Sequence, residues 1–435
     1  MNYKLEDVYG LSRDIPINYV ERNNVDNKLR NNLNRKKHIT IFGSSKQGKT
    51  CLRKHCLEEK DYILIQCSNR WTISDLNTNI LKRAGYEINT SSKTSFSGKT
   101  KITATFSGKV PEVYTASRGF ETEKTLGQEK SFQPLEIDLN DTNDIIAALD
   151  HIEFHKYIVL EDFHYLKTET QRDFAIELKA FHESSDLCFI IVGVWLDENK
   201  LVIYNGDLTG RIIPINADLW NDDDLKRVIQ DGAKYLNISF ADEFINELLE
   251  VASGNVYIVQ EACHLVCEEK EIFTTQEQKT RVGYNISAKE IVRRIIHEQS
   301  GRYNTFLSQY ATGFQETALE MHRWLLYPVL TSGINELSRG LSYRTIRTTI
   351  ESVHPNGKNL NAGNVTQALK AVSSLQIAKS IQPIILDYDE SNLKLHVVDK
   401  GFLIWLATQD RNDLLALAGL PPKLDEITDQ TSLLE

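Results

Sequence analysis

One eight-residue stretch constrains this chain more than any other. Residues 43–50 read Gly-Ser-Ser-Lys-Gln-Gly-Lys-Thr, which matches the phosphate-binding pattern G-x-x-x-x-G-K-[ST]. An apolar run, residues 38–42, comes directly before the stretch, and a helix-like run, residues 50–57, comes directly after it. In a strand, glycine-rich loop and helix of this kind, backbone N–H groups surround phosphate oxygens. The stretch therefore predicts a site for the phosphates of a nucleotide.

The side chains of the motif have separate expected roles. Lys49 is expected to reach the β- and γ-phosphates, and the hydroxyl of Thr50 is expected to bind Mg²⁺. ATP and Mg²⁺ are therefore the cofactors that the motif implies. The residues expected to contact the nucleotide are Gly43, Ser44, Ser45, Lys46, Gln47, Gly48, Lys49, Thr50 and Cys51.

Length and composition bound the remaining choices. The 435 residues predict two or three domains of roughly 100–200 residues each. No apolar run approaches the roughly 20 residues of a membrane span, and the first residues lack the pattern of a signal peptide, so we expect a cytoplasmic protein with no membrane partner. The net charge of −10 argues against a protein that coats nucleic acid, although a local basic surface stays open. The six cysteines lack zinc-ligand spacing and are expected to be free thiols.

Strand and helix patterns alternate between residues 37 and 216. Helical stretches are expected at 50–59, 72–85, 142–153 and 169–183, and apolar strands at 38–42, 62–67, 135–139, 157–160, 188–194 and 211–215. Apolar strands separated by helices predict an α/β fold with a parallel sheet covered on both faces, as in a P-loop NTPase.

A Ser-, Thr-, Gly- and Lys-rich insertion at 89–133 interrupts this alternation. Ile102, Ala104 and Phe106 alternate with polar residues, which predicts a small β-hairpin. We favour a solvated surface insertion that can be deleted without loss of the core. A contact arm for a partner, a neighbouring subunit or nucleic acid is the second interpretation.

The C-terminal half changes character. Residues 217–290 carry helical spacing throughout, and 313–410 read as helices at 315–326, 342–351 and 362–375, strands at 381–388 and 393–398, and a helix at 400–407. Helices followed by a β-hairpin are typical of a winged helix. The expected organisation is an N-terminal segment (1–36), a P-loop domain (37–216), a helical lid (217–290), a C-terminal winged-helix domain (300–410) and a tail (411–435).

Two acids, Glu161 and Asp162, end the apolar run 157–160. In a P-loop site one carboxylate holds Mg²⁺ and the other orients the attacking water. We assign Glu161, with Thr50, to the metal and Asp162 to the water. The shorter acid in second place predicts slow hydrolysis.

Three further positions are less decided. Arg211 begins an expected strand and could reach the γ-phosphate within the subunit or across to a neighbour, or lie at the surface. His164 could contact phosphate, but a turn residue is the favoured interpretation. The end of the strand 188–194 offers no polar side chain to the γ-phosphate, unless Asp197 or Asn199 substitutes for one.

Taken in order along residues 17–410, these pieces resemble an AAA+-type ATPase of the origin-recognition and STAND kind. Val20-Glu21-Arg22 stands where such proteins contact the base, so the resemblance assigns Arg22 to the nucleotide. Residues 222–236 resemble the opening of the family's lid. Residues 253–257 resemble its Gly-x-Pro turn, with Val256 in place of proline. Residues 397–406 resemble the end of the winged helix in small prokaryotic ATPases of this group.

The resemblance implies an ATP-dependent switch. ATP and Mg²⁺ would bind between the P-loop domain and the lid, and slow hydrolysis would reset a change in assembly, in a homo-oligomer, or in binding of a protein partner or effector. A role in prokaryotic defence or signalling is part of what the resemblance implies. The alternative is an ATP-dependent DNA-binding protein of the origin-recognition type, with helix 361–370 and the cations Lys358 and Lys370 in the major groove and Arg339, Arg344 and Arg347 near phosphates. A P-loop kinase is a third reading, without a substrate signature.

Overall fold

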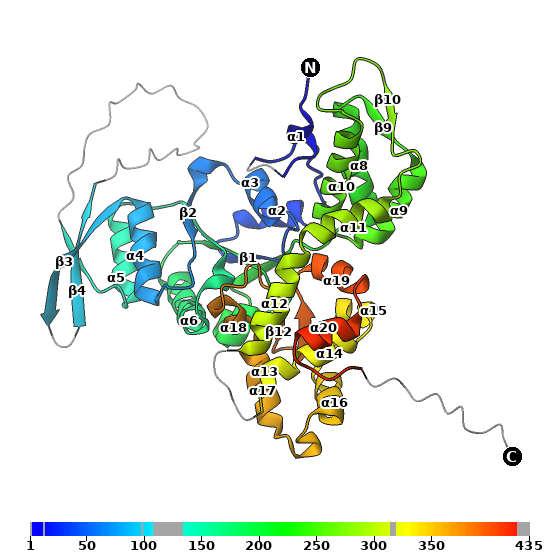
Figure 1. Cartoon of the computed structure of the whole chain (residues 1–435). Coiled ribbons are helices and arrows are strands. Elements are labelled where there is room, and N and C mark those ends of the chain that lie inside the picture. Colours follow the sequence, from blue (N-terminus) through cyan, green and yellow to red (C-terminus); the bar gives the residue numbers. More distant parts are fainter. Residues whose placement is uncertain (1, 12–13, 97–98, 108–133, 314–318, 424–435) are drawn as a thin grey trace.

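The computed structural model describes residues 2–11, 14–96, 99–107, 134–313 and 319–423 (Figure 1). Its centre is a five-stranded sheet in the order β2-β6-β7-β1-β8, and every neighbouring pair is parallel. The predicted α/β fold with a P-loop sheet is confirmed. The strands are β1 (His38–Phe42), β2 (Tyr62–Gln66), β6 (Tyr157–Glu161), β7 (Phe189–Val192) and β8 (Ile212–Asn216).

Alternation along the strands divides the sheet between two hydrophobic cores. Val159 packs on one face with Leu29 and Leu52, whereas Leu160 packs on the other with Phe174. Successive side chains of a strand point to opposite faces, so strands covered on both faces read as continuous apolar runs. The covering helices are α2 (Asp26–Leu33), α3 (Lys49–Cys56), α4 (Ile73–Ala84), α5 (Thr142–His151), α6 (Thr168–Ser184) and α7 (Lys200–Tyr204).

The strand expected at 135–139 does not join the central sheet, so that expectation is wrong. Residues Leu135–Ile137 form β5, which pairs antiparallel with β4 (Lys99–Phe106), and β4 pairs with β3 (Tyr86–Phe96). The predicted hairpin is therefore confirmed. Its side chains at Ile102, Ala104 and Phe106 are buried in the core shared with α4 and α5. The interpretation of a solvated insertion fails for this part, and residues 108–133 lie outside the described residues.

Helices follow the central sheet, as predicted for the lid. They are α8 (Asp222–Tyr235), α9 (Asp242–Ala252), α10 (Val256–Glu269) and α11 (Ala288–Glu298), joined by the short parallel pair β9 (Ile238–Phe240) and β10 (Thr280–Val282). The N-terminal segment, with α1 (Leu5–Val8), packs on this helical unit, since the Tyr9 hydroxyl donates to the Ile229 carbonyl. A Cβ on Gly232 would lie 2.5 Å from the Tyr9 ring, so a glycine is required there.

The C-terminal part has the predicted winged-helix order. Its three-stranded sheet runs β11-β13-β12. The strand expected at 381–388 begins only at Leu386, because Pro383 has no N–H to donate to a sheet. The helix expected at 315–326 differs too: 314–318 lie outside the described residues, and a break at Leu325 separates α13 from α14.

The bounds of the C-terminal elements complete the description. The helices are α12 (Ser300–Thr312), α13 (Met321–Trp324), α14 (Leu326–Thr331), α15 (Ile334–Arg339), α16 (Tyr343–Val353), α17 (Ala362–Lys370), α18 (Val372–Ala378), α19 (Lys400–Ala407) and α20 (Arg411–Leu417). The strands are β11 (Leu341–Ser342), β12 (Leu386–Asp389) and β13 (Lys394–Val397), and 3₁₀ turns cover Glu59–Asp61, Phe163–Tyr165, Gly206–Leu208 and Gly357–Asn359. Within the described ranges, none of these helices combines the length and the apolar character needed to cross a membrane.

A buried carboxyl between α4 and α6 predicts a pH-dependent stability. Burial raises the pKa of Glu177 to about 8, although Asn77 donates to both of its oxygens at 3.2 and 3.3 Å. The Asn77 Oδ1 atom is buried without a partner among the described residues. As pH rises above the ordinary pKa of a glutamate, the unfolded chain releases this proton, whereas the folded chain keeps it up to about pH 8. The free energy of unfolding therefore falls as pH rises towards 8.

The variant Glu177→Gln should therefore be more stable than the parent at pH 8, by about 1–3 kcal/mol, since its amide N–H₂ can donate to the orphaned acceptor. The difference should shrink at pH 5, where both side chains are neutral. Thermal unfolding at the two pH values measures it, with the exposed Glu169→Gln on the same helix as control. Equal gains at both pH values, or none, would contradict this account.

Candidate functional site

The loop after β1 has the shape that its glycines permit. Gly43 has φ +145° and Gly48 has φ +79°, backbone conformations that side chains rarely adopt. A Cβ on Gly43 would lie 2.6 Å from Oδ1 of Asp218. Helix α3 begins at Lys49, so its N-terminal N–H groups point at the space in front of the loop.

Lys49 is turned back onto its own loop. Its Nζ donates to the carbonyls of Gly43 at 3.1 Å and of Ser44 at 2.6 Å. Burial lowers the pKa of Lys49 to about 8, and the nearby carboxylates of Asp218 and Asp162 oppose that shift. An ammonium held by two neutral carbonyls gains from a stronger anionic acceptor, such as a phosphate oxygen.

The two expected magnesium ligands lie together. The Thr50 hydroxyl donates to Oε1 of Glu161 at 2.7 Å, and Arg53 Nε donates to Oε2 of the same carboxylate at 3.1 Å. Arg53, whose side chain is 2% exposed, was not predicted from the sequence to belong to the site. Its position three residues after Thr50, on the same face of α3, was the available signal.

Asp162 stands beside this cluster and faces the same space. Its backbone has φ +56°, and Gln66 donates a hydrogen bond to its Oδ2. Burial raises the pKa of Asp162, and the neighbouring Glu161 raises it further, while Lys49 lowers it. A carboxylate with a raised pKa in a cleft is suited to accept a proton from water.

A pocket of about 520 Å³ opens in front of the loop. This volume falls within the range of small-molecule sites. Its lining includes residues 45–51, Asp162, the N-terminal residues Tyr19 and Val20, and Trp220 and Tyr257 from the lid side. The expected contacts Ser45, Lys46, Gln47, Gly48, Lys49, Thr50 and Cys51 therefore all border one space.

Arg22 is near the pocket but does not line it. Its guanidinium lies 4.0 Å above the Trp220 ring, and its Nη1 donates to the Ala217 carbonyl at 2.7 Å. Arg22 thus supports Trp220, which does line the pocket and was not identified from the sequence. A direct contact of Arg22 with the base stays a prediction.

Ser44 has a partner that the sequence analysis also missed. Its backbone N–H donates to Asp218 at 2.7 Å and its hydroxyl donates to the same carboxylate at 2.5 Å. Asp218 follows β8 and precedes the lid, so it joins the loop to the start of the lid.

The structure does not bring Arg211 to this pocket. Its carbonyl accepts from the N–H of His38 at 3.1 Å, at the amino ends of β8 and β1, whereas the P-loop follows the carboxyl end of β1. Its side chain pairs with Glu183 at 2.6 Å. A contact with the γ-phosphate inside the subunit is therefore not formed, and a contact across to a neighbour stays a prediction.

The winged helix meets the loop directly. The backbone N–H of Ser45 donates to the carbonyl of Val398 at 2.9 Å. Val398 also packs in a small apolar cluster with Val194, at the end of β7, and with Ile377 and Ile384 of the winged helix. This contact between the segment after β7 and the C-terminal domain could not be predicted from the sequence, because it joins residues more than 180 positions apart.

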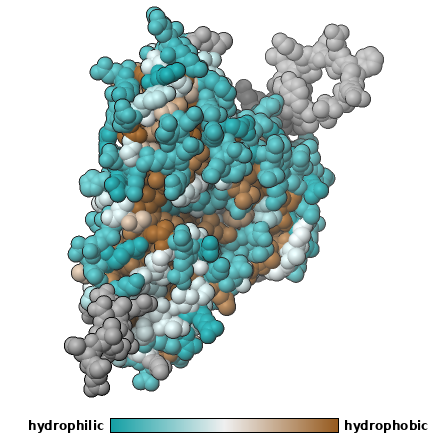
Figure 2. All heavy atoms as spheres, turned by 90° about the vertical axis from the view of Figure 1, so that its right-hand side faces the viewer, coloured by the Kyte–Doolittle hydropathy of each residue, from teal (hydrophilic) through white to brown (hydrophobic). Residues whose placement is uncertain are grey.

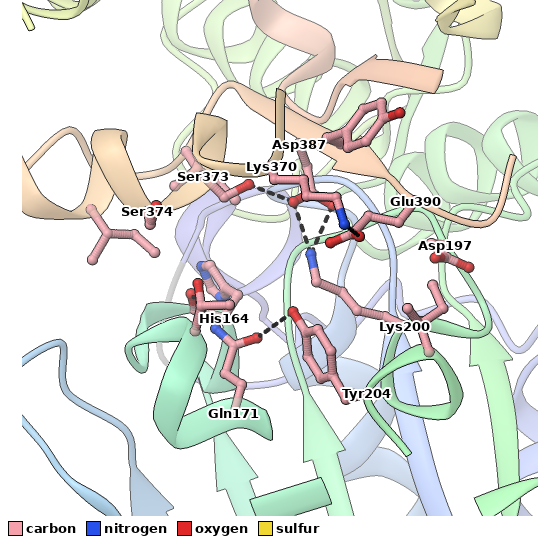
Figure 3. A pocket seen from close by; sticks show the side chains of 15 residues that line it. His164, Gln171, Asp197, Lys200, Tyr204, Lys370, Ser373, Ser374, Asp387 and Glu390 are labelled. Atoms are coloured by element: carbon pink, nitrogen blue, oxygen red, sulfur yellow. Dashed lines mark hydrogen bonds and ion pairs between the residues drawn. The ribbon is translucent and has the colours of Figure 1, made fainter. Parts of the chain in front are cut away.

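A buried ion pair reinforces the same contact (Figure 3). Lys200 of α7 binds Asp387 of β12 at 2.8 Å, and the Ser373 hydroxyl donates to Asp387 at 2.5 Å. Asp197, considered above as a γ-phosphate contact, instead accepts from the Ser391 hydroxyl of the winged helix.

His164 lies between the nucleotide pocket and the small cavity of about 40 Å³ beside this ion pair (Figure 3). Its ring is buried, and neither ring nitrogen has a hydrogen-bond partner among the described residues. Burial lowers its pKa well below the ordinary value, and Lys49 and Lys200 add to the shift. His164 lies in the 3₁₀ turn Phe163–Tyr165, as the favoured interpretation has it, although its ring is buried, and a contact with phosphate stays a prediction.

The lid reaches both the loop and the winged helix. Lys46 Nζ lies 3.8 Å from the centre of the Tyr257 ring, a cation–π contact between the loop and α10. Lys400 Nζ donates to the Gly254 carbonyl at 3.2 Å, which ties α19 to the turn before α10.

Comparisons with known proteins support the fold. Neither the family models nor the curated proteins give a match to this sequence. The structure is similar to the Walker-type ATPase PABY2304 of Pyrococcus abyssi, with 11% identity, a TM-score of 0.54, and 92% of this chain and 99% of that chain covered. Orc1 of Aeropyrum pernix, solved in a complex with DNA, matches with 11% identity and a TM-score of 0.43 over 95% of this chain and 98% of its own. The RuvB branch-migration motor of Thermotoga maritima matches with 11% identity and a TM-score of 0.37 over 88% and 94%.

The first of these likenesses shows the fold and nothing finer. At that level the expected fold of a P-loop ATPase is confirmed. The role of each residue in the pocket rests on the geometry above.

The lowered pKa of Lys49 predicts how nucleotide affinity depends on pH. A phosphate beside Lys49 favours its charged form, so binding must restore a proton once the free protein has lost it. The affinity for ATP should be constant below about pH 7 and fall by up to about tenfold per unit as pH rises above 8.

Titration calorimetry between pH 6.5 and 9.5, in buffers of different ionisation enthalpy, measures both affinity and proton uptake. The matched control is Lys49→Arg, whose guanidinium stays charged, so any residual affinity should not change over this range. A flat profile for the parent protein would contradict the buried-ammonium account.

Proposed function

We propose that this chain is an ATP-binding, slowly hydrolysing switch of the AAA+/STAND type, in which the nucleotide decides whether the winged helix stays docked on the P-loop. The observation that carries the proposal is the hydrogen bond from the Ser45 N–H to the Val398 carbonyl. A backbone amide of the phosphate-binding loop is thereby held by the C-terminal domain.

The pocket fits a nucleotide with its metal. The Gln47 side-chain amide is buried without a hydrogen-bond partner among the described residues, as expected of a loop built around a polar ligand. Thr50 and Glu161 offer the hydroxyl and carboxylate oxygens that Mg²⁺ prefers. Held by these two residues, Mg²⁺ would supply positive charge that neutralises the charge developing on the phosphates.

The remaining residues have distinct roles in hydrolysis under this proposal. Lys49 leaves the carbonyls of Gly43 and Ser44 and contacts the phosphates. Asp162 orients the attacking water and accepts its proton, for which its raised pKa is suited. Arg53 holds Glu161 in position through Oε2. The short side chain of Asp162, already engaged by Gln66, limits the rate.

The coupling to the winged helix follows from competition for one donor. Phosphate oxygens and the Val398 carbonyl are both acceptors, so both draw on the Ser45 N–H, and a charged acceptor binds it more strongly. A bound triphosphate therefore weakens the docking of the winged helix. The docked state is held by the Lys200–Asp387 pair and the Val398 cluster, which together set the opposing free energy.

The output of such a switch is a change in what the chain can bind. Release of the winged helix would expose Asp387, Ser373 and the apolar residues around Val398 to a protein partner, an effector or another copy of the chain. Arg211 lies at the amino ends of β1 and β8, opposite the P-loop, and stays a proposed contact to the nucleotide of a neighbouring subunit. The resemblance to STAND proteins supports a role in signalling or defence.

The DNA-binding alternative receives less support from the geometry. Helix α17 ends at Lys370, which pairs with Glu390 at 2.6 Å, and Arg347 pairs with Glu351 at 2.6 Å. Of the three arginines expected near phosphates, Arg339 and Arg344 are exposed. Duplex affinity that falls steeply with salt would revive this alternative.

Two variants test the nucleotide site. Lys49→Ala should lose ATP binding, because it removes the ammonium that meets the phosphates, whereas Asp162→Ala should bind ATP with little change and lose hydrolysis by at least about a hundredfold. Binding by calorimetry and phosphate release measure the two effects.

Particle mass with and without ATP and Mg²⁺ should be recorded for the same proteins. Unchanged ATP affinity in Lys49→Ala would refute the site. If Glu161→Ala stops hydrolysis with binding intact while Asp162→Ala does not, the assignment of the two acids is reversed.

A second prediction concerns the docked state. Asp387→Ala leaves Lys200 buried without its partner, which typically costs about 3–5 kcal/mol, and it should release the winged helix without nucleotide. Small-angle scattering should then show an expanded particle, like the one that the proposal expects of the parent with ATP.

The double variant Lys200→Met/Asp387→Leu replaces the charge pair by apolar side chains and should restore a compact particle. If Asp387→Ala remains compact while it stays folded, the ion pair does not hold the domain.

A further inference from the structure

A groove runs between the lid and the C-terminal domain and reaches Ser44 of the P-loop, although it shares no lining residue with the nucleotide pocket. It encloses about 1270 Å³ and is bordered by α11, α15 and α19. Figure 2, which looks onto this side, shows hydrophobic surface gathered in a hollow of the molecule. The apolar part of the lining includes Val292, Ile296, Leu403, Ile404 and Trp405.

The charged part of the lining is basic. Four of the lining residues are lysine or arginine (Lys289, Arg293, Arg294 and Lys400), whereas the acidic one is Asp218. This contrasts with the net charge of −10 of the whole chain. Arg294 pairs with Glu269, but Lys289 and Arg293 are exposed and show no ion pair in the described part of the chain. The groove therefore favours an occupant that is both acidic and apolar.

The last residues of this chain have that composition. Residues 424–435 read Leu-Asp-Glu-Ile-Thr-Asp-Gln-Thr-Ser-Leu-Leu-Glu, with four acidic residues, four aliphatic residues and no basic residue. They lie outside the described residues. Nucleic acid would match the charge of the groove, but its contacts are mainly to phosphates and leave an apolar floor unused. An acidic peptide with leucines matches both halves of the lining.

The tail starts beside the groove. The N–H of Lys423, the last described residue, donates to Oδ1 of Asn412 at 3.1 Å. Gln409, which lines the groove, precedes Asn412 by three residues, so their Cα atoms are at most about 11 Å apart. Twelve further residues can extend about 40 Å, whereas helix α11 is only about 16 Å long. The tail is long enough to follow the groove within its own chain.

We propose that residues 424–435 bind in this groove of the same chain. The leucines cover the floor formed by α11 and α19, and the acidic side chains pair with Lys289 and Arg293. Because the groove extends to Ser44 and Asp218 behind the P-loop, the bound tail links the C-terminus to the lid and the loop. The inference goes beyond the proposed switch and stands without it.

Zero-length carbodiimide cross-linking of the full chain, read by peptide mass spectrometry, tests the proposal. The expected product joins Lys289 to Asp425, Glu426 or Asp429. In a mixture of ¹⁴N- and ¹⁵N-labelled protein, the product should contain one isotope only, which places the tail in its own chain. Mixed products would show exchange between copies and overturn the proposal in its stated form.

Matched variants test the charged contacts and the apolar contacts of the tail separately. Arg293→Glu should reduce the yield at Lys289 by at least about fivefold through like-charge repulsion, and Leu433→Ser/Leu434→Ser should reduce it without changing any charge. Lys279→Glu, an exposed lysine of the lid outside the groove, should leave the yield unchanged. An unchanged yield in Arg293→Glu would overturn the proposal.

Cross-linking in the presence of duplex DNA tests whether nucleic acid occupies the groove instead of the tail. Added DNA should leave the cross-link intact if the tail occupies the groove. Absence of the cross-link, together with DNA binding that Arg293→Glu abolishes, would assign the groove to nucleic acid and overturn the proposal.

Discussion

Two backbone amides of the loop at residues 43–48 connect the main parts of this chain. The Ser44 N–H is held by Asp218, which leads into the lid, and the Ser45 N–H is held by the Val398 carbonyl of the winged helix. Buried amides need partners, so a loop of this kind cannot be left without acceptors when no phosphate is present. Here the acceptors come from the lid side and from the C-terminal domain. A ligand that competes for these amides must therefore affect both.

Much of the fold could be predicted because its signals are local. The strand before the P-loop, the acids after β6 and helix α19 at Lys400–Ala407 were each visible in a short window of sequence. Pairing between distant segments was not visible. Residues 135–139 did carry one unused signal: Leu-Glu-Ile-Asp-Leu alternates apolar and acidic residues, as a half-exposed strand such as β5 does, whereas strands covered on both faces are continuous apolar runs. The site shows the same division. Thr50 and Glu161 could be paired from their motifs, whereas Arg53 and Trp220 act through tertiary contacts, and the distance of Arg211 from the loop follows from the direction of β8.

The contact between the winged helix and the P-loop domain is of a kind that can separate. The cluster around Val398 is small. In the Lys200–Asp387 pair, two charged groups lose water, and their mutual attraction offsets only part of that desolvation cost. A buried ion pair adds little net stability compared with an apolar contact of the same volume, although it fixes one geometry. Interfaces between domains of one chain are commonly of this mixed character and permit relative motion. The docked geometry is thus specific without being permanently closed.

The lid supplies a second route between nucleotide and winged helix. Tyr257 at the start of α10 receives Lys46 of the loop, and the turn before α10 receives Lys400 of α19 through the Gly254 carbonyl. Both contacts lie within four residues of the start of α10. If α10 rotates towards a nucleotide, the Lys400–Gly254 hydrogen bond is kept only if α19 moves with it. The Ser45–Val398 bond and the Tyr257–Gly254 turn therefore act on the two ends of one short segment, residues 398–400. A nucleotide that takes the Ser45 N–H from Val398 and draws α10 towards itself would therefore change the contacts at both ends of that segment, the strand-to-helix ending of the winged helix.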